Sequence, residues 1–298
     1  MNLWQLHIFC KVIELKSFSK TGEVIHLSQP TISTHIKDLE NFFECRLIDR
    51  MGKQALPTRA GELLYGYARR LLLLSEETKS AVAAFKGKLS GRLVIGGSTI
   101  PGGYLLPKVI GDFKKQYKEV TVSILISDTK QIIEDIQKGL IEFGIVGGTS
   151  SAKGIVQEPL MEDEMRLIVP AGHKWAARKS VTAAMLKKEP FLVREQGSGT
   201  LSSLKKILSK KQIDVQSFNI VAEMGSTTAV IQGIKNGIGV SILSRMAIAE
   251  ELKAGSLAAL TVDGLDLKRS FFLTRHGQRT ASPIAHTFTR FLQEAVKP

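Results

Sequence analysis

The stretch LSQPTISTHIKDLE, residues 27–40, decides the fold of the first part of this chain. Ser28 can cap a helix through its hydroxyl group, and Pro30 suits the first helical turn, where its missing N–H costs little. Apolar side chains then recur three or four residues apart, at Ile32, Ile36, Leu39 and Phe43. This spacing predicts a helix that begins near Ser28 and buries that apolar face.

The opposite face of the same helix is small and polar, and it carries Pro30, Thr34, Lys37 and Asn41. Two shorter helices are predicted before it, over about 3–15 and 18–25, and a small hairpin after it, over about 47–57. Two short helices joined by a tight turn are typical of the helix-turn-helix, whose second helix enters the major groove of DNA. A serine-capped helix pair is also common in helical cores, so this interpretation depends on the order of the parts: a three-helix unit, a basic hairpin and then a long helix of the kind that pairs two subunits.

Candidate DNA contacts lie at the start and on the outer face of the third helix and in the hairpin. Short side chains let the backbone come close to DNA, and Gln or Thr can meet base edges. Lys37 is expected to bind a phosphate, while the basic side chains of the hairpin can reach phosphates or the minor groove. The candidates are Ser28, Gln29, Pro30, Thr31, Ser33, Thr34, Lys37, Arg50 and Lys53.

A long helix is predicted to start after Thr58, which has the character of a cap. Apolar positions recur along it with alternating spacings of four and three residues. They are Ala60, Leu64, Tyr67, Leu71, Leu74, Thr78, Ala81 and Phe85. Such a seam needs a partner helix, from a second subunit or, alternatively, from the same chain. Ser90 and Gly91 mark the boundary after it.

The composition is that of a globular protein with excess positive charge. The chain has 298 residues, 43% of them hydrophobic, and a formal net charge of +13, and its length fits two or three compact units. The charge does not locate a nucleic-acid site, because residues 16–53 hold six basic and five acidic side chains. No signal peptide or long apolar run is evident, so we expect a cytoplasmic protein without membrane contact. Cys10 and Cys45 are expected to be buried, reduced thiols.

After Gly91 short apolar runs alternate with helical stretches, for example at 93–95, 120–126, 130–139 and 143–146. Alternating strands and helices predict a mostly parallel α/β sheet with helices on both faces, and about 200 residues suffice for two lobes. Several strands end in glycine and hydroxyl residues before a helix. Because ligands bind at the carboxyl ends of such strands and helix N-termini attract anions, a site for a small anion is expected there. Any one of these residues can equally be a simple cap or turn.

The candidate effector-binding residues come from four such junctions. They are Ser98, Thr99, Ile100, Thr149, Ser198, Gly199, Thr200 and Ser226.

Signatures of catalysis are missing from the sequence. There is no GxGxxG fingerprint, no phosphate-binding GxxxxGK[ST] loop, no pair of histidines four residues apart and no GxSxG around Ser198. We therefore expect neither an enzyme nor a metal or cofactor site. A solute-binding protein without gene regulation is a remote alternative, but it would leave residues 1–90 unexplained.

The motifs together resemble one known family. Ser17-Phe18-Ser19, LSQPTISTHIKDLE, LIDR (47–50) and PTRAGE (57–62) are similar to the winged helix-turn-helix of LysR-type transcriptional regulators. The resemblance implies an N-terminal all-α winged helix-turn-helix over 1–58 and a dimerisation helix over 59–90. It implies a two-lobed α/β effector domain like periplasmic binding proteins over 91–298, with lobe I at 91–163 and 268–298 and lobe II at 164–267.

The same resemblance implies partners and mechanism. A homodimer paired through the long helix, or a tetramer, would bind an operator with an interrupted inverted repeat of double-stranded DNA, with RNA polymerase as a further candidate partner. Activation is the commoner outcome in the family. GSTIPGGYLLP (97–107) and REQGSGT (194–200) look most like the branch that governs sulfur assimilation. The expected effector is thus a small anion such as sulfate, sulfite, thiosulfate or an acetylated serine, and the alternative is an aromatic or organic acid.

Overall fold

The computed structural model describes residues 1–51, 54–85 and 89–297. The chain divides into two compact units, of which the first holds the N-terminal 88 residues and the second almost all of the rest. Each unit is described by itself.

Three helices and a hairpin form the first part of the N-terminal unit. The helices are α1 (Leu3–Leu15), α2 (Phe18–Ile25) and α3 (Gln29–Phe43), and the strands are β1 (Ile48–Met51) and β2 (Gln54–Pro57), which pair antiparallel. Each helix begins at a polar cap, since the side chains of Asn2, Ser17 and Ser28 accept from backbone N–H groups of their first turns. Of these caps, the one at Ser28 was predicted. The predicted helices and their order are confirmed.

The core of this unit lies between the three helices and the hairpin. Its fully buried side chains include Leu6, Phe9, Val12, Ile32, Ile36, Leu39 and Leu47. The turn between α2 and α3 packs directly on α2, since a Cβ atom at Gly22 would lie only 2.4 Å from the Leu27 carbonyl oxygen. The helix-turn-helix therefore has a fixed geometry.

Two details of the sequence prediction are wrong in this region. Phe43, the last residue of α3, keeps 38% of its surface exposed instead of completing the buried face. Cys45 is exposed, because α3 has already ended at Glu44, where a left-handed backbone turns the chain away from the core. Only Cys10 is buried as expected, and burial raises the pKa of its thiol to about 12.

The long helix α4 (Arg59–Phe85) follows the hairpin. Thr58 caps it, accepting from Gly61 N at 3.0 Å, and its hydroxyl donates to the Arg46 carbonyl oxygen at 2.8 Å. Leu64 packs on the core of the helix-turn-helix. Farther along, the seam is exposed within the single chain, with Tyr67 at 56%, Leu74 at 57% and Phe85 at 93%.

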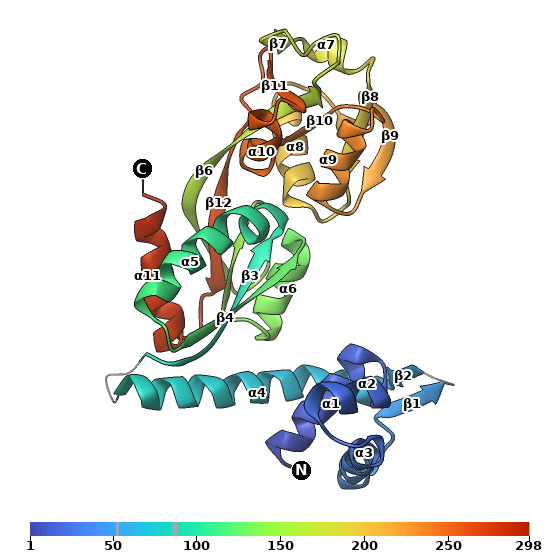
Figure 1. Ribbon diagram of the computed structural model, residues 1–298, viewed down its shortest axis with the longest axis vertical. Coiled ribbons are helices and arrows are strands. Elements are labelled where there is room, and N and C mark those ends of the chain that lie inside the picture. Colours follow the sequence, from blue (N-terminus) through green and yellow to red (C-terminus); the bar gives the residue numbers. More distant parts are fainter. Residues whose placement is uncertain (52–53, 86–88, 298) are drawn as a thin grey trace. The chain divides into compact units, whose positions relative to one another are not determined.

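The second unit is an α/β domain with two lobes (Figure 1). The first lobe contains β3 (Gly91–Ser98), β4 (Val120–Ser127), β5 (Phe143–Val146), the short π-helix η1 (Pro101–Leu105), α5 (Leu106–Gln116), α6 (Thr129–Lys138) and α11 (Pro283–Ala295). Helices α5 and α11 cover one face of its sheet, where Phe113 meets Phe288, and α6 covers the other with Ile132 and Ile136.

The second lobe contains β7 (Ser180–Val181), α7 (Ala183–Leu186), β8 (Pro190–Arg194), α8 (Gly199–Ser209), β9 (Asn219–Met224), α9 (Thr227–Lys235), β10 (Ser241–Ser244), α10 (Ala249–Lys253) and β11 (Leu257–Val262), with the short helices η2 (Val215–Ser217) and η3 (Arg245–Ile248). Its core includes Leu167, Phe191, Leu204, Leu208 and Ile242.

Two long strands, β6 (Ile155–Pro170) and β12 (Lys268–His276), join the lobes. β6 pairs with β12 up to Glu164, and from Met165 onward with β10 and β11. These pairings are antiparallel, whereas β3 pairs parallel with β4 and β5, and β8 parallel with β9. The predicted mostly parallel sheet is thus wrong for the connecting strands. The acidic residues of β6, with Glu162, Asp163 and Glu164 in a row, hid this 16-residue strand from the sequence analysis.

Candidate DNA interface and effector site

The outer face of α3 and strand β1 form a groove of about 570 Å³. It brings together the predicted residues Ser33, Thr34, Lys37 and Arg50, and also Glu40, Arg46 and Ile48. The Arg50 guanidinium lies 4.6 Å from the centre of the Phe18 ring, so α2 helps to hold this cation beside the groove. Glu40 accepts from Leu47 N and Ile48 N and thereby fixes the chain that leads from α3 into the hairpin.

The remaining predicted residues lie at the start of α3. Ser28 caps the helix and shares a 2.7 Å hydrogen bond with the Thr31 hydroxyl, and Gln29 Nε2 donates to Ser33 Oγ at 3.2 Å. Pro30 is exposed in the first turn, and its carbonyl accepts from Thr34 Oγ1. Lys53 lies outside the described residues. Arg46 is the basic side chain of the groove that sequence reasoning missed, although its place just before the hairpin was a usable signal.

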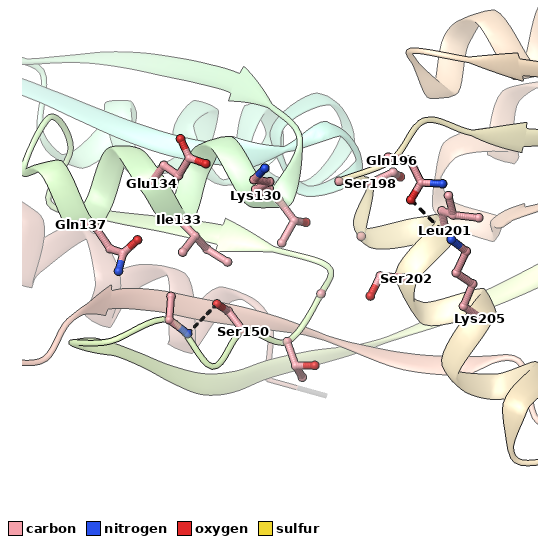
Figure 2. A pocket seen from close by; sticks show the side chains of 16 residues that line it. Lys130, Ile133, Glu134, Gln137, Ser150, Gln196, Ser198, Leu201, Ser202 and Lys205 are labelled. Atoms are coloured by element: carbon pink, nitrogen blue, oxygen red, sulfur yellow. Dashed lines mark hydrogen bonds between the residues drawn. The ribbon is translucent and has the colours of Figure 1, made fainter.

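A cavity of about 490 Å³ lies between α6 of the first lobe and α8 of the second (Figure 2). Three predicted effector residues line it, Thr149, Ser198 and Gly199. The structure adds lining residues that the sequence did not single out, above all Thr129, Lys130, Ser202 and Lys205. Lys130 and Lys205 project from facing helices, and Lys205 Nζ lies 3.4 Å from Gln196 Oε1.

The N-terminal turns of both helices border this cavity. Asp128 Oδ1 accepts from Gln131 N at the start of α6, and Ser198 Oγ accepts from Thr200 N at the start of α8. Gly199 is required where the lobes meet, because a Cβ there would lie 2.6 Å from Thr129 Oγ1 and 2.9 Å from the Gly147 carbonyl carbon. Thr129 is 6% exposed, and among the described residues its hydroxyl has no hydrogen-bond partner.

The other predicted effector residues do not line the cavity. Ser98 Oγ accepts from Gly147 N at 3.1 Å, Ser226 caps α9 and Ile100 is buried in the core. Thr99 and Thr200 instead accept hydrogen bonds from two buried arginines, Arg194 and Arg269.

Arg194 is 3% exposed and joins both lobes. Its guanidinium makes two 2.7 Å contacts with Glu195, donates to Thr227 Oγ1 at 2.6 Å and reaches Thr99 Oγ1 of the first lobe at 3.1 Å. Sequence reasoning missed both arginines. A charged residue in a strand is typical of an exposed position, and only their distant partners reveal that they are buried.

Comparisons with known proteins agree with this architecture. The profile described as "Bacterial regulatory helix-turn-helix protein, lysR family" matches residues 3–62, and "LysR substrate binding domain" matches residues 86–297. The chain is 31% identical over 295 residues to a probable RuBisCO transcriptional regulator of Trichormus variabilis, with 97% of this chain and 87% of that protein covered. It is 33% identical over 265 residues to the HTH-type transcriptional regulator CysL of Bacillus subtilis, with 89% of this chain and 87% of that protein covered.

Among solved structures, the crystal structure of CbnR, a LysR family transcriptional regulator, superposes with a TM-score of 0.77 at 20% identity, covering all of both chains. This likeness shows the fold. The chain belongs to the LysR family: it is a DNA-binding transcriptional regulator with an effector-binding domain, and not an enzyme. Within the described residues, no helix is long and apolar enough to cross a membrane.

Proposed function

We propose that this regulator binds its operator through α3 and the hairpin. The groove formed by Ser33, Thr34, Lys37, Arg46 and Arg50 supports this proposal, since it places short polar side chains beside three cations. The helix start, with Gln29 and Thr31, meets base edges, while Lys37 and the arginines hold phosphates. DNA binding rests on the shape and polarity of this surface more than on the net charge of the chain.

The active form is a homodimer paired through α4, and two dimers form a tetramer. The exposed Tyr67, Leu71, Leu74 and Phe85 support pairing, because an apolar stripe of this length is costly to leave in water. A two-fold dimer requires two half-sites of matching symmetry, so the operator is an interrupted inverted repeat. A protein with these partners acts in the cytoplasm, and it activates transcription by contacting RNA polymerase.

The cleft between the lobes binds a small anion, for which a sulfur oxyanion is the first candidate. The observation that carries this proposal is the cavity between α6 and α8, which is lined by Lys130 and Lys205 and by Thr129, whose buried hydroxyl has no partner among the described residues. Two helix N-termini border the same space, and their partial positive charge favours an anion. The 33% identity to CysL supports the sulfur branch.

A different small metabolite, such as an organic or aromatic acid, is the second candidate effector. The similarity over 97% of the chain to probable RuBisCO transcriptional regulators supports this second candidate, because these relatives are named for a function other than sulfur assimilation. Both candidates place the ligand between lobe I (91–163 and 268–298) and lobe II (164–267), and ligand binding shifts the balance between two lobe arrangements.

A thermal-shift panel separates the two candidates. Sulfate, sulfite, thiosulfate and O-acetylserine are compared with aromatic and organic acids at constant ionic strength. Saturable stabilisation by the first set supports the sulfur proposal. Stabilisation only by an aromatic or organic acid would contradict it. A gel-retardation assay with the upstream intergenic DNA tests the regulator itself, for which wholly salt-labile, sequence-independent binding is the contrary result.

A further inference from the structure

Arg269 lies at the point where the two lobes are joined. It stands on β12 directly opposite Asp163 on β6, and both residues are buried, at 8% and 4% exposure. Arg269 Nε donates to Asp163 Oδ2 at 2.8 Å. The other carboxylate oxygen, Oδ1, accepts from Ser244 Oγ at 2.6 Å. Asp163 therefore contacts the guanidinium through one carboxylate oxygen only, and the two terminal nitrogens of Arg269 need other partners.

One of these nitrogens has a partner and the other does not. Nη1 donates to Thr200 Oγ1, in the first turn of α8, at 3.2 Å. No protein atom of the described residues accepts from Nη2, although Nη2 is buried. Buried donors in native proteins are almost always satisfied, and an unsatisfied charged donor is more costly than a neutral one. This arrangement calls for an acceptor that the chain itself does not supply.

The surroundings of this guanidinium favour a negatively charged acceptor. Burial lowers the pKa of Arg269 below its usual value, the Asp163 carboxylate opposes that shift, and the positive charge of Arg194 adds to it. A second anion beside the two arginines would stabilise both cations. The Gly147 backbone and the Phe271 ring lie beside this guanidinium: a Cβ at Gly147 would lie 3.3 Å from the ring and 3.4 Å from Arg269 Nη1, and the guanidinium carbon lies 5.1 Å from the ring centre.

We propose that Arg269 Nη2 binds an oxygen of the effector and selects a small oxyanion, such as sulfate, thiosulfate or a compact carboxylate. This inference rests on the proposed anion-binding function of the cleft, and it names the side chain that binds the anion. The oxyanion reaches Nη2 when the lobes separate along the contact of Gly147 with Gly199. Because Arg269 and Asp163 belong to the two strands that connect the lobes, binding at this point acts directly on their relative arrangement.

The test uses the full-length protein and a variant that removes the ion pair as a unit. Removing only Arg269 would leave Asp163 buried without a counter-ion, which often unfolds a protein. The double variant Arg269→Met/Asp163→Asn avoids this problem, and the amide oxygen of the introduced asparagine can still accept from Ser244. The matched control is Arg275→Met/Glu158→Gln, on the same strand pair, where a 2.8 Å ion pair is exposed. Binding of sulfate, thiosulfate, phosphate and acetate is measured by calorimetry at constant ionic strength.

We expect at least one oxyanion to bind the wild type and the control equally, and to bind Arg269→Met/Asp163→Asn about 10- to 100-fold more weakly, as for the loss of a charge-assisted hydrogen bond. An unchanged unfolding transition and unchanged DNA affinity of the double variant would show that it folds. Undiminished oxyanion binding by a folded double variant would overturn this inference and leave the anionic effector standing. Absence of binding to the wild type by all four anions would overturn this inference together with the sulfur-oxyanion proposal, and would leave a larger organic or aromatic acid as the candidate effector.

Discussion

The guanidinium of Arg194 in the second lobe donates a 3.1 Å hydrogen bond to Thr99 Oγ1 in the first lobe, 95 residues earlier in the chain. A second hydrogen bond also joins the lobes: Ser203 Oγ, on α8 of the second lobe, donates to the Gly147 carbonyl oxygen of the first lobe at 3.0 Å. The lobes are thus held together by polar contacts between side chains and backbone. This relationship gives the effector domain a closed state with identifiable bonds.

Loss of the Thr99 acceptor should weaken the closed state. Thr99→Val leaves one donor of a buried cation unpaired, so the free energy of unfolding should fall by about 1–2 kcal/mol. Urea denaturation followed by circular dichroism measures this change. Thr121→Val, an exposed threonine on β4, is the matched control and should stay within about 0.5 kcal/mol of the wild type. Equal effects of both substitutions would show that the bond to Arg194 contributes nothing.

The exposed seam of α4 should set the oligomeric state. Leu74→Lys places a charge in the middle of the proposed helix pair, so the dimer should dissociate at concentrations where the wild type stays associated. Sedimentation velocity measures this shift. Glu76→Lys introduces the same side chain two residues away, off the seam, and should leave the dimer intact. A Leu74→Lys protein as large as the wild type would contradict pairing through this face.

Lys37 should contribute to DNA affinity without contributing to sequence preference. Lys37→Ala should weaken binding to specific and unrelated DNA by a similar factor and reduce the slope of log K against log salt by about 0.9, the value for one phosphate contact. Titrations at several salt concentrations measure both quantities. Lys11→Ala, which removes a cation of α1 paired with Glu14, should change neither. A change in sequence preference on losing Lys37 would instead place its side chain on a base edge.

The two thiols should differ in reactivity and in their effect at high pH. Cys45 is exposed and should react with iodoacetamide in the native protein, whereas Cys10 should react only after unfolding, as mass spectrometry can show. The raised pKa of Cys10 means that the native state retains its proton more strongly than the unfolded state. Its contribution to stability is therefore complete below about pH 9 and is lost as the pH rises towards 12. Cys10→Ala should flatten this alkaline loss. An equal loss in wild type and variant would contradict it.

The sequence predicted what depends on local chemistry and failed where distant residues decide. Helix starts at Ser28 and Thr58 follow from side chains that cap the next turn, so α3 and α4 could be placed closely. The length of β6 could not, because its acidic residues are accommodated by pairing with β12, about 110 residues later.

The candidate effector site shows the same division. Residues at strand ends, most of them with hydroxyl groups, were predicted to bind the effector. Of the predicted residues, only Thr149, Ser198 and Gly199 line the cavity. Arg194 and Arg269 went unnoticed because their hydrogen-bond partners lie between 33 and 106 residues away in the chain. These partners are Thr227 and Thr99 for Arg194, and Asp163 and Thr200 for Arg269.

An anion in the cleft should change how this regulator binds its operator. The most direct measurement is a fluorescence-anisotropy titration of full-length protein with its upstream intergenic DNA, with and without the bound oxyanion at constant ionic strength. We expect tighter binding to this DNA than to unrelated DNA, and a Kd that the oxyanion shifts for the wild type but not for Arg269→Met/Asp163→Asn. Equal affinity for both DNAs, or a Kd that no effector candidate changes, would contradict it.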